Sequence, residues 1–311
     1  MADFVIISDT GGDLTKDLRE RFLVDDYIHG VLYLPDGKET CSDLDWSFIS
    51  PTEYFNSMKS KKVIYKTAAP TLGETQEVFE KYLKDGKDIL SVSMSSGLSC
   101  TYQNCVNVAK ELSEKYPERK IVCVDSLRYS TSLALILALA GEKKKLGASL
   151  QETADFIESI KHKVHQNGPM DDLFFLCKTG RISNFKAFFG SLIGVNPLAD
   201  FNRNGMSEVL GKAKGKKAAL EITLKYIEKT IVNPSEQIIF IAHSIREEVA
   251  KVLAEQIKEK FNPKEIIINT VGMSCGANIG PGLVAAFYLG EEISENNEKE
   301  KAIIAEIMNA K

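Results

Sequence analysis

The sequence predicts an α/β protein: a parallel-sheet, three-layer α/β/α N-terminal domain at residues 1–167, a second, mixed α+β domain at 168–290, and a charged helical tail at 291–311. Two observations support this prediction. In the first half, short apolar runs alternate with segments of helical period, which is typical of a sheet covered by helices on both faces. In the second half, Asn204-Gly205 between two apolar runs indicates an antiparallel hairpin. The 311 residues, 44% of them hydrophobic, suffice for two cores.

Apolar periodicity and helix caps define the elements of the first domain. T-x-x-E at 71–74 and S-x-x-E at 149–152 are the expected capping boxes of two helices. A β-α-β unit covers residues 88–126, and right-handed crossover makes its strands parallel neighbours. QNGPMDD, from residue 166, interrupts the pattern and marks the domain boundary. The expected strands are 4–9, 27–34, 88–94 and 120–126, and the expected helices are 51–60, 71–86, 99–116 and 149–165.

The second domain has a mixed pattern. We expect a strand at DLFFLC (172–177), a helix at NFKAFFGSLI (184–193) and a hairpin within 196–215. A strand at 236–243, a helix at 244–261 and a strand at 265–272 then restore β-α-β order.

Composition argues against several classes of protein. The six cysteines are scattered without a C-x-x-C pair, so neither a disulfide framework nor a zinc ribbon is indicated. The spacing of His162 and His165 suits the solvated surface of a charged helix better than a pair of ligands, and a metal enzyme is not indicated. We expect no resident cofactor.

The N-terminal MADFVIISD has no basic leader, and the longest apolar run, 133–140, is too short to cross a bilayer. We therefore expect a soluble cytoplasmic protein without an integral membrane segment. The basic stretch GKAKGKKAA (211–219) lacks interleaved aromatic residues, and the net charge is −4. It is either a solvated loop and helix start or a partner-docking patch, and it does not indicate nucleic-acid binding.

Three turns rich in hydroxyl groups stand out: ISDTGGD (7–13), KTAAPT (66–71) and SMSSGLSCTYQN (93–104). Each follows an extended segment, so we expect them to converge at the carboxyl edge of one sheet, where ligands collect in open α/β folds. Hydroxyl groups and free N–H groups at a helix N-terminus suit an anion. Neither G-x-x-x-x-G-K-[ST] nor G-x-G-x-x-G follows a strand, so no ATP or dinucleotide site of those classes is predicted.

Ser99 has two alternative roles. It can cap the following helix, or it can act as the nucleophile of a serine-dependent acyl hydrolase with Asp125 and His243. The elbow pattern G-x-S-x-G fails because Thr101 stands where glycine belongs. A regulatory nucleic-acid-binding protein that uses Lys214 and its neighbours is a further alternative.

Six ordered motifs point to a known family: SDT (8–10), KTAAPTLGE (66–74), SSGLSCTYQ (95–103), VDS (124–126), KTGRIS (178–183) and GANIGPG (276–282). Over residues 4–290 the chain resembles the DegV family, the fatty-acid-binding proteins that serve as B subunits of bacterial fatty acid kinase.

The resemblance implies a long-chain fatty acid in a tunnel between the two domains. Its carboxylate would be held by Thr67, Ser95, Ser96 and Asn278, with Ser96 favoured over Ser95. Residues in or near the acyl tunnel would be Gly97, Arg181, Ser183, Phe185, Phe188, Phe189 and Ile279, although the aromatic residues suit an ordinary core equally well.

The resemblance also implies a division of labour. A separate kinase catalytic subunit would supply ATP and form the acyl phosphate, docking near Lys214. This chain would be a lipid carrier without catalysis of its own, and it would contact membranes only transiently to exchange lipid.

Four positions depart from the family pattern. Ala68 removes a hydroxyl that the family often has, and Cys100 replaces a usual glycine. Asn278 replaces a histidine and so keeps a hydrogen-bond donor without a titratable one. Lys214 stands where kinase-coupled members have an arginine, replacing a planar fork by a point charge. Lipid binding tolerates these changes better than kinase coupling does.

The energetics suit a lipid. Burying about 14 methylenes contributes on the order of 11 kcal/mol, before ordering and association costs. A buried carboxylate without partners costs several kcal/mol, so two or three hydroxyl and backbone donors are expected around it.

Overall fold

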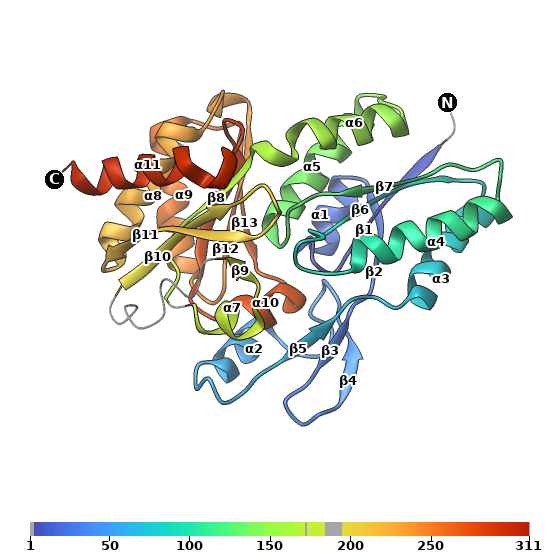
Figure 1. Ribbon diagram of the computed structural model, residues 1–311, viewed down its shortest axis with the longest axis horizontal. Helices are drawn as coiled ribbons and strands as arrows, with labels where there is room; N and C mark the ends of the chain where they lie inside the picture. The colour runs from blue at the N-terminus through green and yellow to red at the C-terminus, as the bar shows by residue number, and fades with distance from the viewer. Residues whose placement is uncertain (1–2, 172, 184–194, 311) are drawn as a thin grey trace. The chain divides into compact units, whose positions relative to one another are not determined.

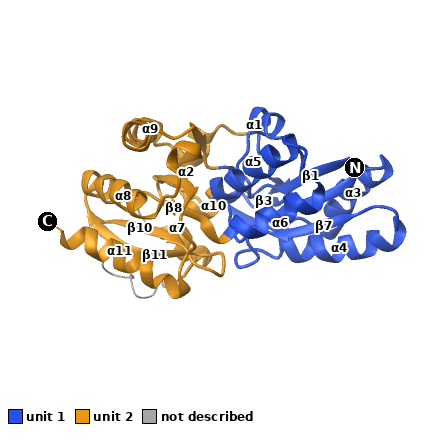
Figure 2. Ribbon diagram, turned by 90° about the horizontal axis from the view of Figure 1, so that it is seen from above, with its two compact units in different colours: residues 1–48, 64–161, 272–275 blue, residues 49–63, 162–271, 276–311 orange. Residues whose placement is uncertain are grey.

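The computed structural model describes residues 3–171, 173–183 and 195–310 (Figure 1). The chain forms two compact units (Figure 2). Unit 1 comprises Met1–Phe48, Ile64–Lys161 and Gly272–Cys275, and unit 2 comprises Ile49–Val63, His162–Val271 and Gly276–Lys311.

This division differs from the predicted contiguous domains. Residues 49–63 belong to unit 2, and 272–275 belong to unit 1. Packing explains the first exchange, because a Cβ added at Gly276 of unit 2 would lie 2.8 Å from Phe55 and 3.3 Å from Tyr54. Contacts between segments distant in sequence define such a unit, and chain order does not reveal them.

Unit 1 is built on a parallel sheet of order β2-β1-β6-β7. Helices α3 and α4 cover one face with Phe79, Leu83, Val108 and Leu112, while α5 and α6 lie on the other (Figure 1). The predicted three-layer α/β/α arrangement is confirmed. The elements are β1 (Phe4–Asp9), α1 (Lys16–Arg21), β2 (Val24–Ile28), α3 (Leu72–Lys84), β6 (Asp88–Ser93), α4 (Thr101–Lys115), β7 (Ile121–Asp125), α5 (Thr131–Lys145) and α6 (Leu150–Ile160).

A small antiparallel sheet of order β4-β3-β5 completes unit 1, with strands β3 (Val31–Tyr33), β4 (Glu39–Cys41) and β5 (Lys66–Ala68). The single strand expected at 27–34 is therefore wrong, because the chain leaves β2 at His29 and Gly30 to enter β3. The Gly30 N–H donates to the Thr10 hydroxyl at 3.2 Å, and the Gly30 carbonyl accepts from the Ser42 N–H at 2.8 Å. These long-range hydrogen bonds interrupt the strand between β2 and β3, and the apolar run of the sequence alone does not reveal the interruption.

Unit 2 contains a mixed sheet of order β13-β12-β14-β8 and a three-stranded sheet of order β10-β11-β9. The hairpin β10–β11 turns around Asn204-Gly205 as predicted. The described helices and strands of unit 2 are α2 (Pro51–Met58), β8 (Val164–Asn167), α7 (Phe174–Thr179), β9 (Ile182–Ser183), β10 (Val195–Phe201), β11 (Ser207–Lys214), α8 (Lys216–Thr230), β12 (Ile238–His243), α9 (Glu247–Phe261), β13 (Glu265–Thr270), β14 (Val284–Leu289) and α11 (Glu298–Asn309). Helix α10 (Met273–Ile279) has residues in both units. Short 3-10 turns are η1 (Lys161–Lys163), η3 (Pro234–Glu236) and η4 (Glu295–Asn297).

The C-terminal segment is helical, as predicted for the tail, and it is part of the fold of unit 2. Ile304 and Ile307 of α11 are buried against Leu198, Leu210 and Tyr226. No helix in the described part of the chain is long and apolar enough to span a bilayer.

Two expectations for the second half are wrong. DLFFLC contributes to the helix α7 and not to a strand, and α7 ends at Gly180 in the left-handed region, φ +69°. The helix expected to reach His165 ends at Ile160, after which β8 pairs with β14. Short apolar segments suit helix and strand alike, and pairing with β14 makes residues 164–167 a strand. The helix expected at 184–193 lies outside the described residues.

The caps were predicted with mixed success. Ser149 and Glu152 form the full capping box of α6. At α3 the Thr71 hydroxyl accepts from the Glu74 N–H at 3.1 Å, but the Glu74 carboxylate instead contacts the backbone and ring of His29. A tertiary partner therefore competes successfully with the local cap.

Candidate functional site

The turns that follow β1, β6 and β7 meet at the carboxyl edge of the parallel sheet in unit 1. The Met94 N–H donates to Asp9 Oδ2 at 2.8 Å, and the Ser130 N–H donates to the Gly11 carbonyl at 2.6 Å. The Ser95 N–H donates to the Arg128 carbonyl at 2.8 Å. The predicted convergence of the turns at 7–13 and 93–104 is therefore confirmed.

The third hydroxyl-rich segment, KTAAPT, does not follow a strand of this sheet, so that part of the prediction is wrong. Thr67 lies on β5 of the small antiparallel sheet, opposite Leu32, and is half-buried. The segment still borders the edge, because the Asn104 side chain of α4 donates to the Pro70 carbonyl at 2.9 Å. A Cβ added at Gly30 would lie 3.1 Å from the Ala68 carbonyl oxygen and 3.0 Å from the Thr10 hydroxyl.

Ser95 is fully buried and organises its own turn. Its hydroxyl oxygen accepts from the Gly97 N–H at 3.2 Å. Its carbonyl accepts from the N–H groups of Leu98 and Ser99 at 3.1 and 3.2 Å. The Ser95 oxygen thus acts as an acceptor, which leaves the hydroxyl proton as its remaining donor.

Ser96 is exposed, and its hydroxyl makes no hydrogen bond to any described residue. Its N–H is occupied by Asp125 Oδ1 at 3.1 Å. The N–H groups of residues 95–99 therefore all have acceptors within the fold. The chain closes the turn at 95–99 with its own acceptors, so the hydroxyl groups are the donors that remain within that turn.

The serine-hydrolase alternative gains no support from these contacts. The Ser99 hydroxyl lies 2.8 Å from the Thr101 hydroxyl and accepts from the Thr101 N–H at 3.3 Å. Asp125 Oδ1 holds the turns through the N–H groups of Ser96 and Leu127. Ser99 therefore helps start α4, and no described imidazole hydrogen-bonds to it or to Asp125.

Two buried carboxyl groups, Asp9 and Asp13, support the same edge, and sequence reasoning did not single them out. Asp9 accepts from the N–H groups of Gly11 at 2.7 Å and Met94 at 2.8 Å. Asp13 accepts from the hydroxyls of Ser130 and Thr131. Burial raises the pKa of Asp9 to about 6 and that of Asp13 to about 7. Their place in SDTGGD, directly after a buried strand, was the signal available.

The residues predicted in the second half lie in unit 2. Exposed Arg181 bonds locally, with its guanidinium donating to the Thr179 carbonyl. The Ser183 hydroxyl donates to the Ser207 carbonyl at 3.1 Å and links β9 to β11. Asn278 is half-buried on α10, Ile279 is buried, and Lys214 is exposed at the end of β11. Phe185, Phe188 and Phe189 lie outside the described residues. Gly97, by contrast, belongs to unit 1 and is exposed in the turn that Ser95 organises.

No described cluster of three or more His, Cys, Asp or Glu side chains could hold a metal ion.

Comparisons with known proteins agree along almost the whole chain. The family model described as "Uncharacterised protein, DegV family" matches residues 3–291. A DegV domain-containing protein of Clostridium perfringens is 35% identical over 291 residues, which cover 94% of this chain and 99% of the relative.

Solved structures share the fold. A Thermus thermophilus structure described as fatty acid binding of a DegV family protein has a TM-score of 0.80 at 25% identity, covering 93% of this chain and 100% of the other. DegV of Bacillus subtilis, described as a fatty acid binding protein, has a TM-score of 0.79 at 20% identity, covering 94% and 100%. A DegV family protein of Eubacterium eligens, described as loaded with heptadecanoic acid, has a TM-score of 0.79 at 20% identity, covering 92% and 99%. With the family match and the 35% identical relative, these likenesses lead to one conclusion: this chain belongs to the DegV family.

Proposed function

We propose that this chain binds a long-chain fatty acid and holds its carboxylate on the hydroxyls of Thr67, Ser95 and Ser96. The observation that carries the proposal is the uncommitted hydroxyl of Ser96, next to buried Ser95 at the carboxyl edge of a parallel sheet. Family relatives described as fatty-acid-binding proteins support the choice of ligand.

The hydroxyl groups can supply what a carboxylate needs. The Ser95 oxygen already accepts from the Gly97 N–H, so its proton is directed to a further acceptor. Ser96 can donate freely, and Thr67 adds a third hydroxyl from β5. Because the amides of the turn are occupied, these short charge-assisted bonds offset the desolvation of the carboxylate, and burial of the acyl chain supplies most of the affinity at about 0.8 kcal/mol per methylene.

We infer further that the chain acts as a carrier without a cofactor and presents the bound acid to a separate kinase catalytic subunit. The chain contains neither G-x-x-x-x-G-K-[ST] nor G-x-G-x-x-G after a strand. Exposed Lys214 is the proposed docking residue, and Asn278 is a proposed additional donor to the carboxylate. Kinase coupling is tested by adding a fatty acid kinase catalytic subunit with ATP and fatty acid. We expect acyl phosphate only when both proteins are present, and a Lys214→Glu variant should reduce its formation without changing lipid affinity.

Organic extraction of the purified protein followed by mass spectrometry tests the ligand itself, and an acyl chain of fatty acid type is expected. The site is tested by titrating delipidated protein with a fatty acid. Thr67→Val combined with Ser96→Ala should weaken binding by about tenfold or more, the scale of one to two charge-assisted hydrogen bonds. The matched control is Thr15→Val with Ser159→Ala, two exposed positions of unit 1. Equal affinities in the two double variants would refute the head-group assignment, and absence of bound or bindable lipid would refute the function.

A further inference from the structure

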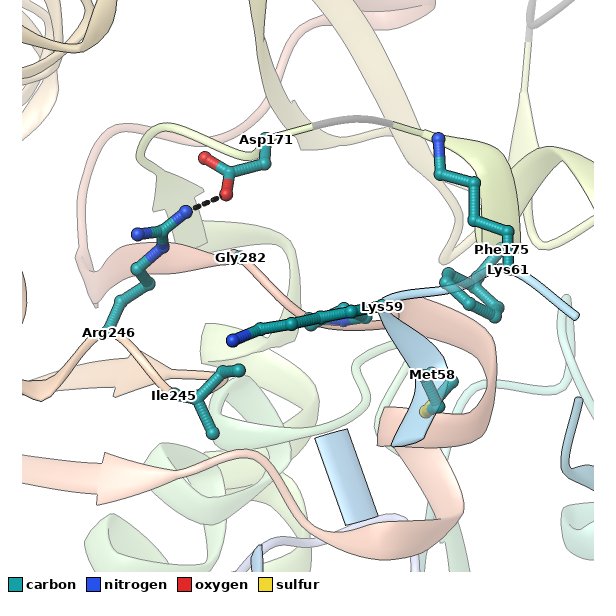
Figure 3. A pocket seen from close by; sticks show the side chains of 9 residues that line it. Met58, Lys59, Lys61, Asp171, Phe175, Ile245, Arg246 and Gly282 are labelled. Carbon is teal, nitrogen blue, oxygen red and sulfur yellow. Dashed lines mark hydrogen bonds and ion pairs between the residues drawn. The ribbon is translucent and has the colours of Figure 1, made fainter. Parts of the chain in front are cut away.

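Unit 2 contains a pocket of about 280 Å³ with a charged lining (Figure 3). Lys59, which follows α2, extends its side chain into the pocket beneath Arg246. Asp171 and Gly282 form one wall, and Phe175 forms part of another. The residues come from four separate segments of the chain, so the cationic character of the pocket arises from the fold.

The charges of the pocket do not cancel. Asp171 is the only carboxylate in the described lining, and it pairs with the Arg246 guanidinium and with Lys216 Nζ at 3.1 Å. One carboxylate between two cations leaves a net positive charge. Lys59 also lines the pocket and forms no ion pair with a described residue, and Lys61, the third cation of the lining, lies over the Phe174 ring. The pocket therefore favours an anion of about two charges.

Two glycines allow close backbone approach here, Gly282 to the Asp171 carboxylate and Gly280 to the Phe175 ring. Gly282 has φ +101°, and a Cβ there would lie 2.6 Å from Asp171 Oδ2. Its N–H donates to the Ser244 carbonyl at 3.0 Å, while its carbonyl accepts from the Asp171 N–H at 3.3 Å. Gly280 has φ +78°, and a Cβ there would lie 2.2 Å from the Phe175 ring. The backbone bonds hold Asp171, and through it Arg246, before any ligand arrives.

An adjoining pocket of about 680 Å³ shares Lys59, Ile245 and Arg246 with the first. It lies at the carboxyl ends of the parallel strands β12 and β13, where His243 pairs in register with Thr270. Such an edge is the usual ligand position in α/β sheets. His243 is only 9% exposed, and its Nδ1 has no hydrogen-bond partner among the described residues. A buried polar atom of this kind calls for a partner.

We propose that the two pockets together bind a small phosphate monoester, with the phosphate between Lys59 and Arg246 and a polar organic portion toward His243. A guanidinium and an ammonium are suited to a phosphate dianion. The adjoining pocket also carries Glu247 and Glu248, both 3.0 Å from Lys251 Nζ, and these carboxylates disfavour a second phosphate at that end. This assignment concerns unit 2 alone and does not depend on fatty acid binding.

Phosphorus NMR and calorimetric titration of the full chain test the proposal, with inorganic phosphate and glycerol 3-phosphate as probes. The wild type should bind both, and the ester more tightly. Lys59→Met should weaken both by about tenfold, the effect of losing one charge-assisted contact. His243→Ala should weaken only the ester. The control is Lys260→Met, an exposed lysine of α9 paired with Glu228 outside both pockets.

Three results would overturn the proposal: no binding of either probe, unchanged binding in Lys59→Met, or equal loss in Lys260→Met. Equal affinity for phosphate and ester would assign the site to free phosphate and reject the ester. Lys59 is exposed, so its replacement should leave the thermal unfolding midpoint unchanged. Arg246→Lys keeps the charge but removes the planar fork, and it should give an intermediate affinity if the guanidinium contacts phosphate.

Discussion

His165 Nδ1 lies 2.5 Å from Asp200 Oδ2, and both side chains are buried, at 1% and 0% exposure. His165 Nε2 lies 2.7 Å from the Glu291 carbonyl oxygen. Both partners of the ring are acceptors, so each nitrogen must carry a proton, and the pair is an imidazolium–carboxylate pair. Asp200 also accepts from the Tyr226 hydroxyl at 2.7 Å. The network joins β8, β10 and α8, and the surface position expected for His165 is therefore wrong.

Breaking this pair should destabilise unit 2. Asp200→Asn removes the charge that neutralises a buried imidazolium, and we expect the free energy of unfolding to fall by about 3–5 kcal/mol. Tyr226→Phe removes one hydrogen bond and should cost about 1–2 kcal/mol. Urea denaturation measures both. A loss below about 1 kcal/mol in Asp200→Asn would contradict the pair as described.

The buried carboxyl group of Asp13 should make stability depend on pH. Its pKa is raised from 3.8 to about 7, chiefly by burial. A folded pKa above the unfolded value gives a contribution that is full below about pH 4 and is lost as the pH rises through about 7. Asp9, with its pKa raised to about 6, acts in the same direction.

Asp13→Asn should therefore flatten the fall in unfolding free energy between about pH 4 and pH 8, relative to the wild type. Chemical denaturation across that range measures the slope. Asp36→Asn is the control, because exposed Asp36 has its pKa lowered by the N–H and ammonium of Lys38. Asp36→Asn should therefore change the unfolding free energy only at acidic pH. An unchanged slope in Asp13→Asn would show that Asp13 titrates alike in the folded and unfolded chain.

Ser95 and Ser96 should separate stability from binding. Ser95→Ala removes the acceptor of the Gly97 N–H in a buried turn, so it should cost about 1 kcal/mol of stability as well as lipid affinity. Ser96→Ala removes a hydroxyl without a described partner, so affinity should fall while the unfolding free energy stays within about 0.5 kcal/mol. Thermal unfolding and fatty acid titration of each variant measure the two effects. If Ser96→Ala lowered stability and Ser95→Ala did not, the structural role would belong to Ser96 and not to Ser95.

Gly280→Ala should destabilise more than Gly180→Ala. Both glycines have positive φ, +78° and +69°, so alanine is strained at each by about 1–2 kcal/mol. At Gly180 nothing lies within 4 Å of the added Cβ, whereas at Gly280 the Phe175 ring lies at 2.2 Å. The overlap should add about 1–3 kcal/mol in denaturation experiments. Equal losses would mean that Phe175 moves aside freely.

Much of the architecture could be predicted because its signals are local. The strands β1, β6, β7, β12 and β13 follow from their apolar runs, and the capping box of Ser149 and Glu152 fixes the start of α6. The failures lie where local signals are ambiguous. DLFFLC suits a helix or a strand, and Glu74 had two partners, Thr71 and His29, between which only the fold could choose.

The site could be predicted in part. Sequence order placed Ser95 and Ser96 after a strand of the parallel sheet, and the structure places them there. It could not show that Asp125 and Ser95 itself occupy the amides of the turn, because hydrogen-bond partners depend on how neighbouring loops meet. Nor could it reveal the pocket of Lys59 and Arg246, residues 187 positions apart by their numbering.

The sequence by itself determined the strands with long apolar runs, the capped helices α3 and α6, the parallel order of β6 and β7, and the family, because periodicity, caps and ordered motifs are properties of short stretches of chain. Only the tertiary structure decided which segments share a unit, which hydroxyls keep a proton to donate, and which charged groups are buried together. Those outcomes depend on desolvation and on partners distant in the chain, and both exist only after the chain has folded.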